Sequence, residues 1–435
     1  METRITTKGG FFASLTVALL SAGLLFTGCQ SGVNQTSTAE AVRMINAASG
    51  ARDYEKVQFL ADSLERAGYL SKGESNYWQG YAHYQQGDRG WAEYFWQEAI
   101  RVTEDSMDPN DLYYYAKSAS YLTSQQCRQA KYAAALQTAL PVISRLERIQ
   151  CDTTSDYNNL LILAGCSKAY FDKADPAAAE MLERAYQKHQ ENIQHKLSKD
   201  AYRDAMVGII NVSYIWSYLK EYEQGLFWTS RLGLLIMEYK TVYPDDKEYI
   251  DKQWARFKIF EAIALEGQGR HEEAESSYQD YLQTKFSQTK EGLTNASDYL
   301  TVAKRWNEAA ASYRTIMDYL RKENNIYSLA NIQRYLLKKY HAYQMLNRQD
   351  SINLTARQIC EVLDSAITNN WRMDASELHA IHVRDMEIVE AEARSARQQQ
   401  IYTAVIGVFL LLALLTFILF RLRMGKRSAK TKKQE

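Results

Sequence analysis

The segment GYAHYQQGDRGWAEYFWQEA, residues 80–99, decides the fold of this chain. A Gly87-Asp88 turn signal separates two stretches, and in the second the small residues Ala92 and Ala99 flank the aromatic Trp96 at helical spacing. Small side chains let two helices approach closely, while large aromatic ones fill the gap to a neighbouring unit. The segment therefore predicts a helical hairpin that must stack on copies of itself to bury a core.

Weaker copies of this pattern follow one another along the chain. The residue that opens the second helix of each copy is expected at Val57, Ala92, Ala130, Ala179, Gly225, Ala274, Ala309 and Ile352. The order of Gly, aromatic, Gly-Asp turn and small residue in residues 80–99 resembles the tetratricopeptide repeat. We therefore predict an all-α, tetratricopeptide-like helical-hairpin solenoid over residues 29–370, with its concave face lined by the first helix of each hairpin.

The C-terminal end predicts a membrane anchor. Twenty uncharged, mostly apolar residues, Ile401–Phe420, are long enough to cross a hydrocarbon core of about 30 Å as one helix. The tail that follows, residues 421–435, carries seven basic residues and one acidic residue, a bias that keeps a tail in the cytoplasm. Residues 371–400 contain no Gly or Pro and are expected to form a juxtamembrane helix that runs into the span.

The N-terminal end predicts export. Arg4 and Lys8 precede an apolar run over residues 11–26, the pattern of a signal peptide covering residues 1–28. The small residues before Cys29 resemble the lipobox of bacterial lipoproteins, which makes Cys29 the expected lipidation site. An ordinary cleaved signal peptide and an uncleaved first membrane helix are the alternatives. We expect a single-pass protein of the bacterial inner membrane, with its ectodomain in the periplasm and its C-terminus in the cytoplasm.

The charge balance argues against a nucleic-acid partner. The leader contributes two basic and one acidic residue and the tail seven and one, which leaves 43 basic and 50 acidic residues between them. Phosphate backbones require clustered Lys and Arg, so an acidic ectodomain of this kind favours a protein or peptide partner.

No residue pattern points to catalysis, a cofactor or a metal. Cys127, Cys151, Cys166 and Cys360 lack the spacing of metal ligands and are expected to be small interior side chains, although the first three could pair in an oxidising compartment. His379 and His382 share one helical face, but two ligands are too few for a closed site. We therefore expect a protein that is not an enzyme.

Candidate binding residues lie on the first helix of the hairpin that contains residues 80–99. Tyr77, Tyr81, Tyr84 and Gln85 occupy positions that line the groove in this type of repeat. Tyrosine contributes a large contact area at low entropy cost, which suits the docking of a peptide. The alternative is that these side chains pack between units.

The whole arrangement resembles the extracytoplasmic sensor half of tetratricopeptide-repeat membrane regulators from Bacteroidetes-type bacteria. The resemblance rests on the leader, the repeats, and Arg397-Gln398-Gln399-Gln400 entering a span followed by Arg421 and Arg423. It also rests on Glu291–Leu293 with Lys304–Trp306, and on Asp364–Ala366 with Asp374–Leu378. In that family a histidine kinase or DNA-binding output follows the span, whereas here 15 residues follow it.

The resemblance implies a sensor module that signals through a separate partner. A structural scaffold of an envelope or secretion complex, a glycan-capturing lipoprotein and a truncated relic of a sensor kinase are the alternatives.

Overall fold

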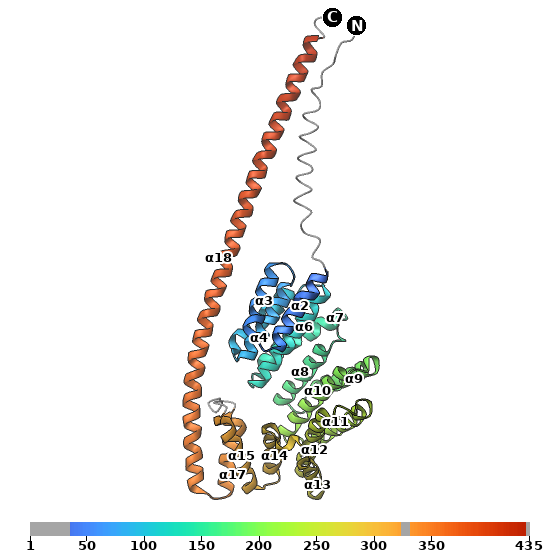
Figure 1. Ribbon diagram of the computed structural model, residues 1–435, viewed down its shortest axis with the longest axis vertical. Coiled ribbons are helices and arrows are strands. Elements are labelled where there is room, and N and C mark those ends of the chain that lie inside the picture. The colour runs from blue at the N-terminus through green and yellow to red at the C-terminus, as the bar shows by residue number, and fades with distance from the viewer. Residues whose placement is uncertain (1–34, 323–330, 432–435) are drawn as a thin grey trace. The chain divides into compact units, whose positions relative to one another are not determined.

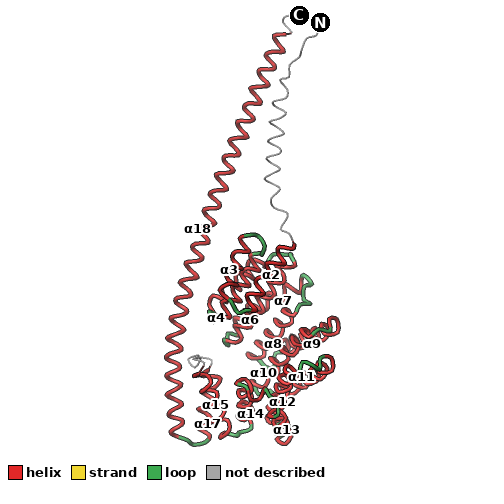
Figure 2. The backbone as a smooth tube through the Cα atoms, viewed as in Figure 1, coloured by secondary structure: helices red, strands yellow, loops and turns green. Residues whose placement is uncertain are grey.

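The computed structural model describes residues 35–322 and 331–431 of the chain. Helices and loops make up all of this described part, and it contains no strand (Figure 2). The expected all-α fold is confirmed. The leader and Cys29 lie outside the described residues.

Helical hairpins follow one another through the array in chain order (Figure 1). The hairpins are α2 (Gln35–Gly50) with α3 (Tyr54–Arg66), α4 (Lys72–Gln86) with α5 (Arg89–Thr103), α6 (Pro109–Arg128) with α7 (Tyr132–Arg148), α8 (Ser155–Phe171) with α9 (Pro176–Lys196), α10 (Lys199–Tyr218) with α11 (Tyr222–Val242), α12 (Lys247–Gly267) with α13 (His271–Leu282), and α14 (Lys290–Val302) with α15 (Trp306–Lys322). A short 3-10 helix, η1 (Phe286–Gln288), precedes α14. A π-helical turn, η2 (Ile332–Leu336), leads into α17 (Leu337–Met345) and then α18 (Gln349–Thr431).

The hairpins pack as a solenoid with two different rows of helices. From α4 to α14, the first helix of each hairpin contacts the first helix of the next one. Consecutive second helices in the described part make at most marginal contact with each other. The first helices therefore form a continuous inner row, as the repeat pattern predicts, and this row positions the site described below.

In the described part, a left-handed residue follows the first helix in six of the seven hairpins, and another separates α17 from α18. These residues, with positive φ, are Arg52, Gly87, Ala130, Lys220, Gly269, Lys304 and Asn347. The next N–H returns to the carbonyl five residues earlier: Asp88 N–H donates to His83 O at 2.9 Å, and Arg270 N–H to Leu265 O at 2.9 Å. This is the Schellman arrangement, which satisfies carbonyls at a helix end.

The residue that opens the second helix stands five positions after each left-handed residue. Val57, Ala92, Gly225, Ala274, Ala309 and Ile352 occupy these positions in α3, α5, α11, α13, α15 and α18. Ala92, Ala274 and Ala309 are fully buried. At Gly80, a Cβ atom would lie 2.7 Å from the Trp96 indole, so the glycine is needed for α4 to approach α5.

Two of the eight expected opening residues are wrong. Ala130 is itself the left-handed turn residue, with φ 58°, and Ala135 is the buried residue that opens α7. In the α8–α9 hairpin the chain turns through Asp175 and Pro176 without a left-handed residue, and Ala178 rather than Ala179 is buried. Alanine rarely adopts the left-handed region, so the sequence gives no sign that Ala130 forms the turn between α6 and α7.

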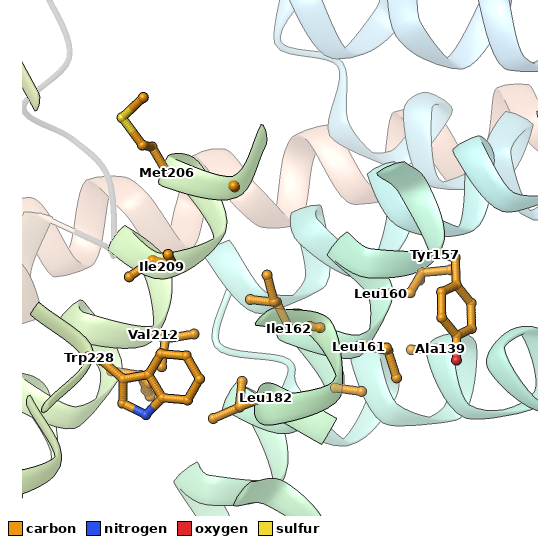
Figure 3. Close-up of a cluster of buried hydrophobic side chains, with 14 of the residues drawn as sticks. Ala139, Tyr157, Leu160, Leu161, Ile162, Leu182, Met206, Ile209, Val212 and Trp228 are labelled. Carbon is orange, nitrogen blue, oxygen red and sulfur yellow. The ribbon is translucent and has the colours of Figure 1, made fainter. Parts of the chain in front are cut away.

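The apolar core belongs to the junctions between hairpins rather than to any one hairpin. In the largest cluster Tyr157 from α8 and Leu182 from α9 share one interior with Val212 from α10 and Trp228 from α11 (Figure 3). This sharing explains why the units occur as an array.

The chain divides into two compact units, Met1–Asn370 and Trp371–Glu435. Helix α18 begins in the first unit, where Val362 joins the core, and continues through the second. Within α18, the stretch Ala393–Leu419 is long and apolar enough to cross a membrane, and none of its most apolar window is buried.

Candidate functional site

A cavity of about 400 Å³ opens on the inner row of first helices, chiefly between α6, α8 and α10. This volume lies within the range of small-ligand pockets, about 300–1,000 Å³. Its lining residues are Tyr84, Trp96, Ser120, Tyr121, Ser124, Gln125, Arg128, Ser155, Asp156, Asn159, Ile162, His189, Asp204, Val207, Gly208 and Asn211. The lining is therefore mostly polar, unlike the apolar junctions beneath it.

Short side chains at helical spacing keep the space open. On α6, Ser120 and Ser124 lie one turn apart on the face that meets α8. On α10, Gly208 faces the cavity, and a Cβ atom there would come within 2.4 Å of Ile162 Cδ1 and 3.3 Å of His189 Nε2. Any larger residue at Gly208 would thus intrude on the wall formed by α8 and α9.

One end of the cavity is acidic. Asp156 lies in the first turn of α8 and Asp204 in α10, where its Oδ2 accepts a hydrogen bond of 2.5 Å from Ser155 Oγ. Burial raises the pKa of Asp156 to about 6, against the opposing effects of the Lys117 charge and the Ser120 hydroxyl, and the Asp204 charge adds to the rise. Burial also raises the pKa of Asp204.

The other end is aromatic and basic. Arg128 Nη1 donates a hydrogen bond of 2.7 Å to the Tyr84 hydroxyl. The Tyr84 ring lies 5.7 Å from that of Trp96, which in turn lies 5.5 Å from Tyr121.

Contacts between α6 and α8 fix how far apart the two ends are. Asn159 Nδ2 donates to Ser120 Oγ at 2.7 Å, and the Cys127 sulfur lies 3.3 Å from Ser167 Oγ, so the helices run side by side with matching levels. The Ser120 hydroxyl is also hydrogen-bonded to the Asp156 carboxyl group, which therefore lies near the level of Ser120, and Arg128 is eight residues further along α6. At 1.5 Å per residue, the two levels are about 12 Å apart along the axis of α6, which sets the approximate spacing of the two ends.

Three side chains in the cavity wall have one buried nitrogen atom without a hydrogen-bond partner among the described residues: Trp96 Nε1, Gln125 Nε2 and His189 Nε2. His189 and Gln125 are each 3% exposed, and the Nε2 atom of each accepts or donates no hydrogen bond among the described residues. Burial lowers the pKa of His189 to about 4, so the imidazole is neutral at physiological pH. Other buried atoms in the described part also lack a partner, and these three are distinguished because their residues line the cavity, which a ligand can reach.

The structure divides the four residues predicted to bind. Tyr84 lines the cavity, and Gln85 is exposed beside it on α4. Tyr81 is half-buried, and Tyr77 is only 2% exposed, with its ring 5.3 Å from that of Tyr114 on α6. Tyr77 therefore packs between hairpins, the alternative reading of its position.

Sequence reasoning missed the acidic end and the buried histidine. The available signal was a stripe of polar residues on the first helices, such as Ser120, Ser124 and Arg128 at intervals of four. On a single helix, such a row of polar residues is typical of a face exposed to solvent. Only the packing of three hairpins converts these stripes into one cavity.

The cysteines and histidines form no metal cluster in the described part of the chain. Cys127, Cys151 and Cys166 are free and half-buried, and Cys151 and Cys166 pack against the largest apolar cluster, whereas Cys360 is free and exposed. The side chains of His379 and His382 lie outside the described residues.

Comparisons with known proteins give only distant structural likenesses. No protein-family model and no curated protein matches the chain. A Rap protein complexed with competence and sporulation factor is similar with a TM-score of 0.46 and 10% identity, over 82% of this chain and 95% of that one. A tetratricopeptide repeat protein from Parabacteroides merdae ATCC 43184 is similar with a TM-score of 0.34 and 14% identity, over 68% of this chain and 100% of that one. The repeat architecture described above therefore rests on the hairpins themselves.

Proposed function

We propose that this chain is a membrane-anchored binding module that captures a ligand in the cavity on its inner row and acts through a partner protein. The observation that carries the proposal is the pair of buried, unpartnered polar atoms, His189 Nε2 and Gln125 Nε2, in the wall of a polar cavity. Their place on the wall of a polar cavity, between two carboxylates and Arg128, is what favours a binding module over a scaffold that only holds other proteins together.

Binding is favoured over catalysis by the surroundings of the histidine. A histidine base normally acts on a hydroxyl or thiol within hydrogen-bond reach. The Nε2 atom of His189 has no such partner among the described residues. The proposed role is therefore recognition of a ligand, with no cofactor or metal.

Placement in the bacterial inner membrane is the second part of the proposal. The stretch Ala393–Leu419 supports an anchor, and the basic residues after it support a cytoplasmic C-terminus with the hairpins in the periplasm. Because α18 contains both the helix that follows α17 and the apolar stretch, one element is available to pass a change in the array to a partner at the membrane. A signalling partner and lipidation of Cys29 belong to the same proposal.

A ligand screen on the full chain in detergent tests the binding function. Val207 lines the cavity and is 48% exposed, so Val207→Trp should fill its mouth, whereas Leu234→Trp places the same ring on the exposed part of α11. At least one class among short peptides, amines, carboxylates and oligosaccharides should raise the melting temperature of wild type and Leu234→Trp but not of Val207→Trp. The cavity is not the site if every stabilising ligand acts equally on Val207→Trp.

Protease protection tests the orientation. Protease added to spheroplasts should digest the hairpins and spare a tag placed after Glu435. Loss of that tag would overturn the orientation, and palmitate labelling that survives Cys29→Ala would remove the lipid anchor.

A further inference from the structure

We propose that the cavity binds a short free peptide in extended form, with its amino terminus between Asp156 and Asp204 and its carboxylate at Arg128. This inference rests on the proposed function, that the cavity is a ligand site, and names the chemical class of its ligand. It follows from three features of the cavity: two ends of opposite charge, an unpartnered polar middle, and the distance between the ends.

The acidic end is suited to a cationic amine. Asp156 and Asp204 both line the cavity, and neither forms an ion pair with a described lysine or arginine. The Lys117 charge stabilises the Asp156 carboxylate in part, but its Nζ forms no ion pair there and instead donates to the Tyr113 hydroxyl at 2.7 Å, 4.9 Å from the Tyr77 ring centroid. Asp156 is half-buried and Asp204 is exposed at the cavity, and both carboxylates accept hydrogen bonds only, so a ligand ammonium group supplies the donors that they lack.

The basic end is suited to a carboxylate. Arg128 is exposed at the cavity, and its Nη1 is oriented by the hydrogen bond to Tyr84. The guanidinium group has five N–H donors, so this single bond leaves others for a bidentate contact with a carboxylate. Two aromatic rings beside it, Tyr84 and Trp96, offer an apolar surface to the last side chain of a peptide.

The middle of the cavity is suited to peptide groups. Gln125 Nε2 can donate to a carbonyl oxygen, and the neutral His189 imidazole can accept from an N–H or donate to a carbonyl, depending on its tautomer. Asn159 and Asn211 add further donors and acceptors along the same wall. A hydrocarbon linker between the charged ends would leave these groups unpaired.

The distance between the ends sets the length of the peptide. An extended chain advances about 3.3–3.6 Å per residue, so a separation of about 12 Å matches three to four residues. A free amino acid is too short to reach both ends, and a diamine offers no group to Arg128. The free amino terminus of a whole protein satisfies the acidic end but not the basic one.

Calorimetric titration of the full chain in detergent with defined peptides tests the inference. The probes are tetra-alanine, N-acetyl-tetra-alanine and tetra-alanine amide, which differ only in which terminus is charged. Free tetra-alanine should bind, and either acetylation or amidation should weaken binding at least tenfold, because a hydrogen bond to a charged group is lost. Equal affinity of all three peptides would overturn the proposal.

Matched variants assign each terminus to its end of the cavity. Asp204→Asn should weaken binding of the free peptide at least tenfold and leave binding of the acetylated peptide unchanged. Arg128→Gln should weaken binding of the free peptide at least tenfold and leave binding of the amidated peptide unchanged. Asp200→Asn is the control, because Asp200 is exposed one turn earlier on α10 and does not line the cavity. If Asp200→Asn has the same effect as Asp204→Asn, long-range charge rather than contact explains the binding, and the proposed contact is wrong.

The outcomes separate this inference from the function on which it rests. If acetylation weakens binding and amidation does not, the cavity binds a cationic group or a protein amino terminus. The proposal that it binds a short free peptide would then be wrong. If no peptide binds but another class loses its effect in Val207→Trp, the cavity remains a ligand site and only its assigned ligand is wrong. If peptide binding survives Val207→Trp, both proposals fall.

Discussion

The left-handed residues at the hairpin turns predict a gain in stability from glycine. Arg52, Ala130, Lys220 and Lys304 have φ between 57° and 61°, and all four are exposed. Since none of the four side chains forms a hydrogen bond or ion pair with the described residues, replacing all four by glycine changes little besides the backbone. The same turn carries glycine at Gly87 and Gly269, so the fold already accepts it there.

The size of the gain follows from two opposing effects. A side chain in the left-handed region costs about 1–2 kcal/mol, and glycine removes that cost. Glycine also loses about 0.4–1 kcal/mol through the greater freedom of the unfolded chain. The net gain is about 0.5–1 kcal/mol per site, or about 2–4 kcal/mol for four distant sites that add. With an unfolding entropy of about 0.7 kcal/mol/K for several hundred residues, the melting temperature should rise by about 3–6 °C.

Circular dichroism of the full chain in detergent measures this change, and the reverse substitutions provide controls. Gly87→Ala and Gly269→Ala should lower the melting temperature, although an added Cβ atom meets nothing within 4 Å at either position. Gly50→Ala, equally open but without positive φ, should not lower it. If the quadruple glycine variant melts at or below the wild-type temperature, backbone strain at these turns is not what limits stability.

Three further predictions concern the core and the cavity. Asp156→Asn should raise the free energy of unfolding by about 2 kcal/mol at pH 7.5 and have little effect at pH 4. The pKa of Asp156 is raised from 3.8 to about 6, so its ionisation destabilises the fold as pH rises through that window. The helix N-terminus offsets part of this cost. Equal effects at both pH values would contradict it. Ala274→Leu should cost about 1–3 kcal/mol by overpacking a fully buried position, whereas Ser276→Leu, exposed on the same helix, should be tolerated; equal melting of the two variants would refute the packing assignment. Tyr77→Ala should cost about 3–5 kcal/mol and affect binding only in step with helicity, and loss of binding without loss of helicity would return Tyr77 to the site.

The sequence predicted the repeat where the turn residues are conventional. Ala92 and Ala274 were placed correctly because each follows a glycine turn, and glycine marks a left-handed residue. Ala135 was missed because the preceding turn uses alanine, which carries no such signal. The other opening residue that was missed, Ala178, follows a turn through Asp175 and Pro176, which is of a different type.

The cavity could not be predicted because it depends on the offset between hairpins. Asp156 and Asp204 are 48 positions apart, and nothing local indicates that they share a wall. Tyr84 was predicted because its own hairpin contains the clearest repeat motif. His189 lies on a second helix, where the repeat pattern predicts no groove residue at all.

The sharing of the core between hairpins has a mechanical consequence. Tyr157, Leu182, Val212 and Trp228 come from four successive helices (Figure 3). Removing one hairpin therefore exposes the apolar side chains of the next hairpin to water. A pull applied through α18 would therefore detach the array from that end in successive steps rather than all at once. Neighbouring opening residues lie 35 (Val57 to Ala92, and Ala274 to Ala309) to 49 (Gly225 to Ala274) positions apart, and each step would release about 120–175 Å of extended chain. Stretching single molecules held at both ends should give a sawtooth of force with that spacing.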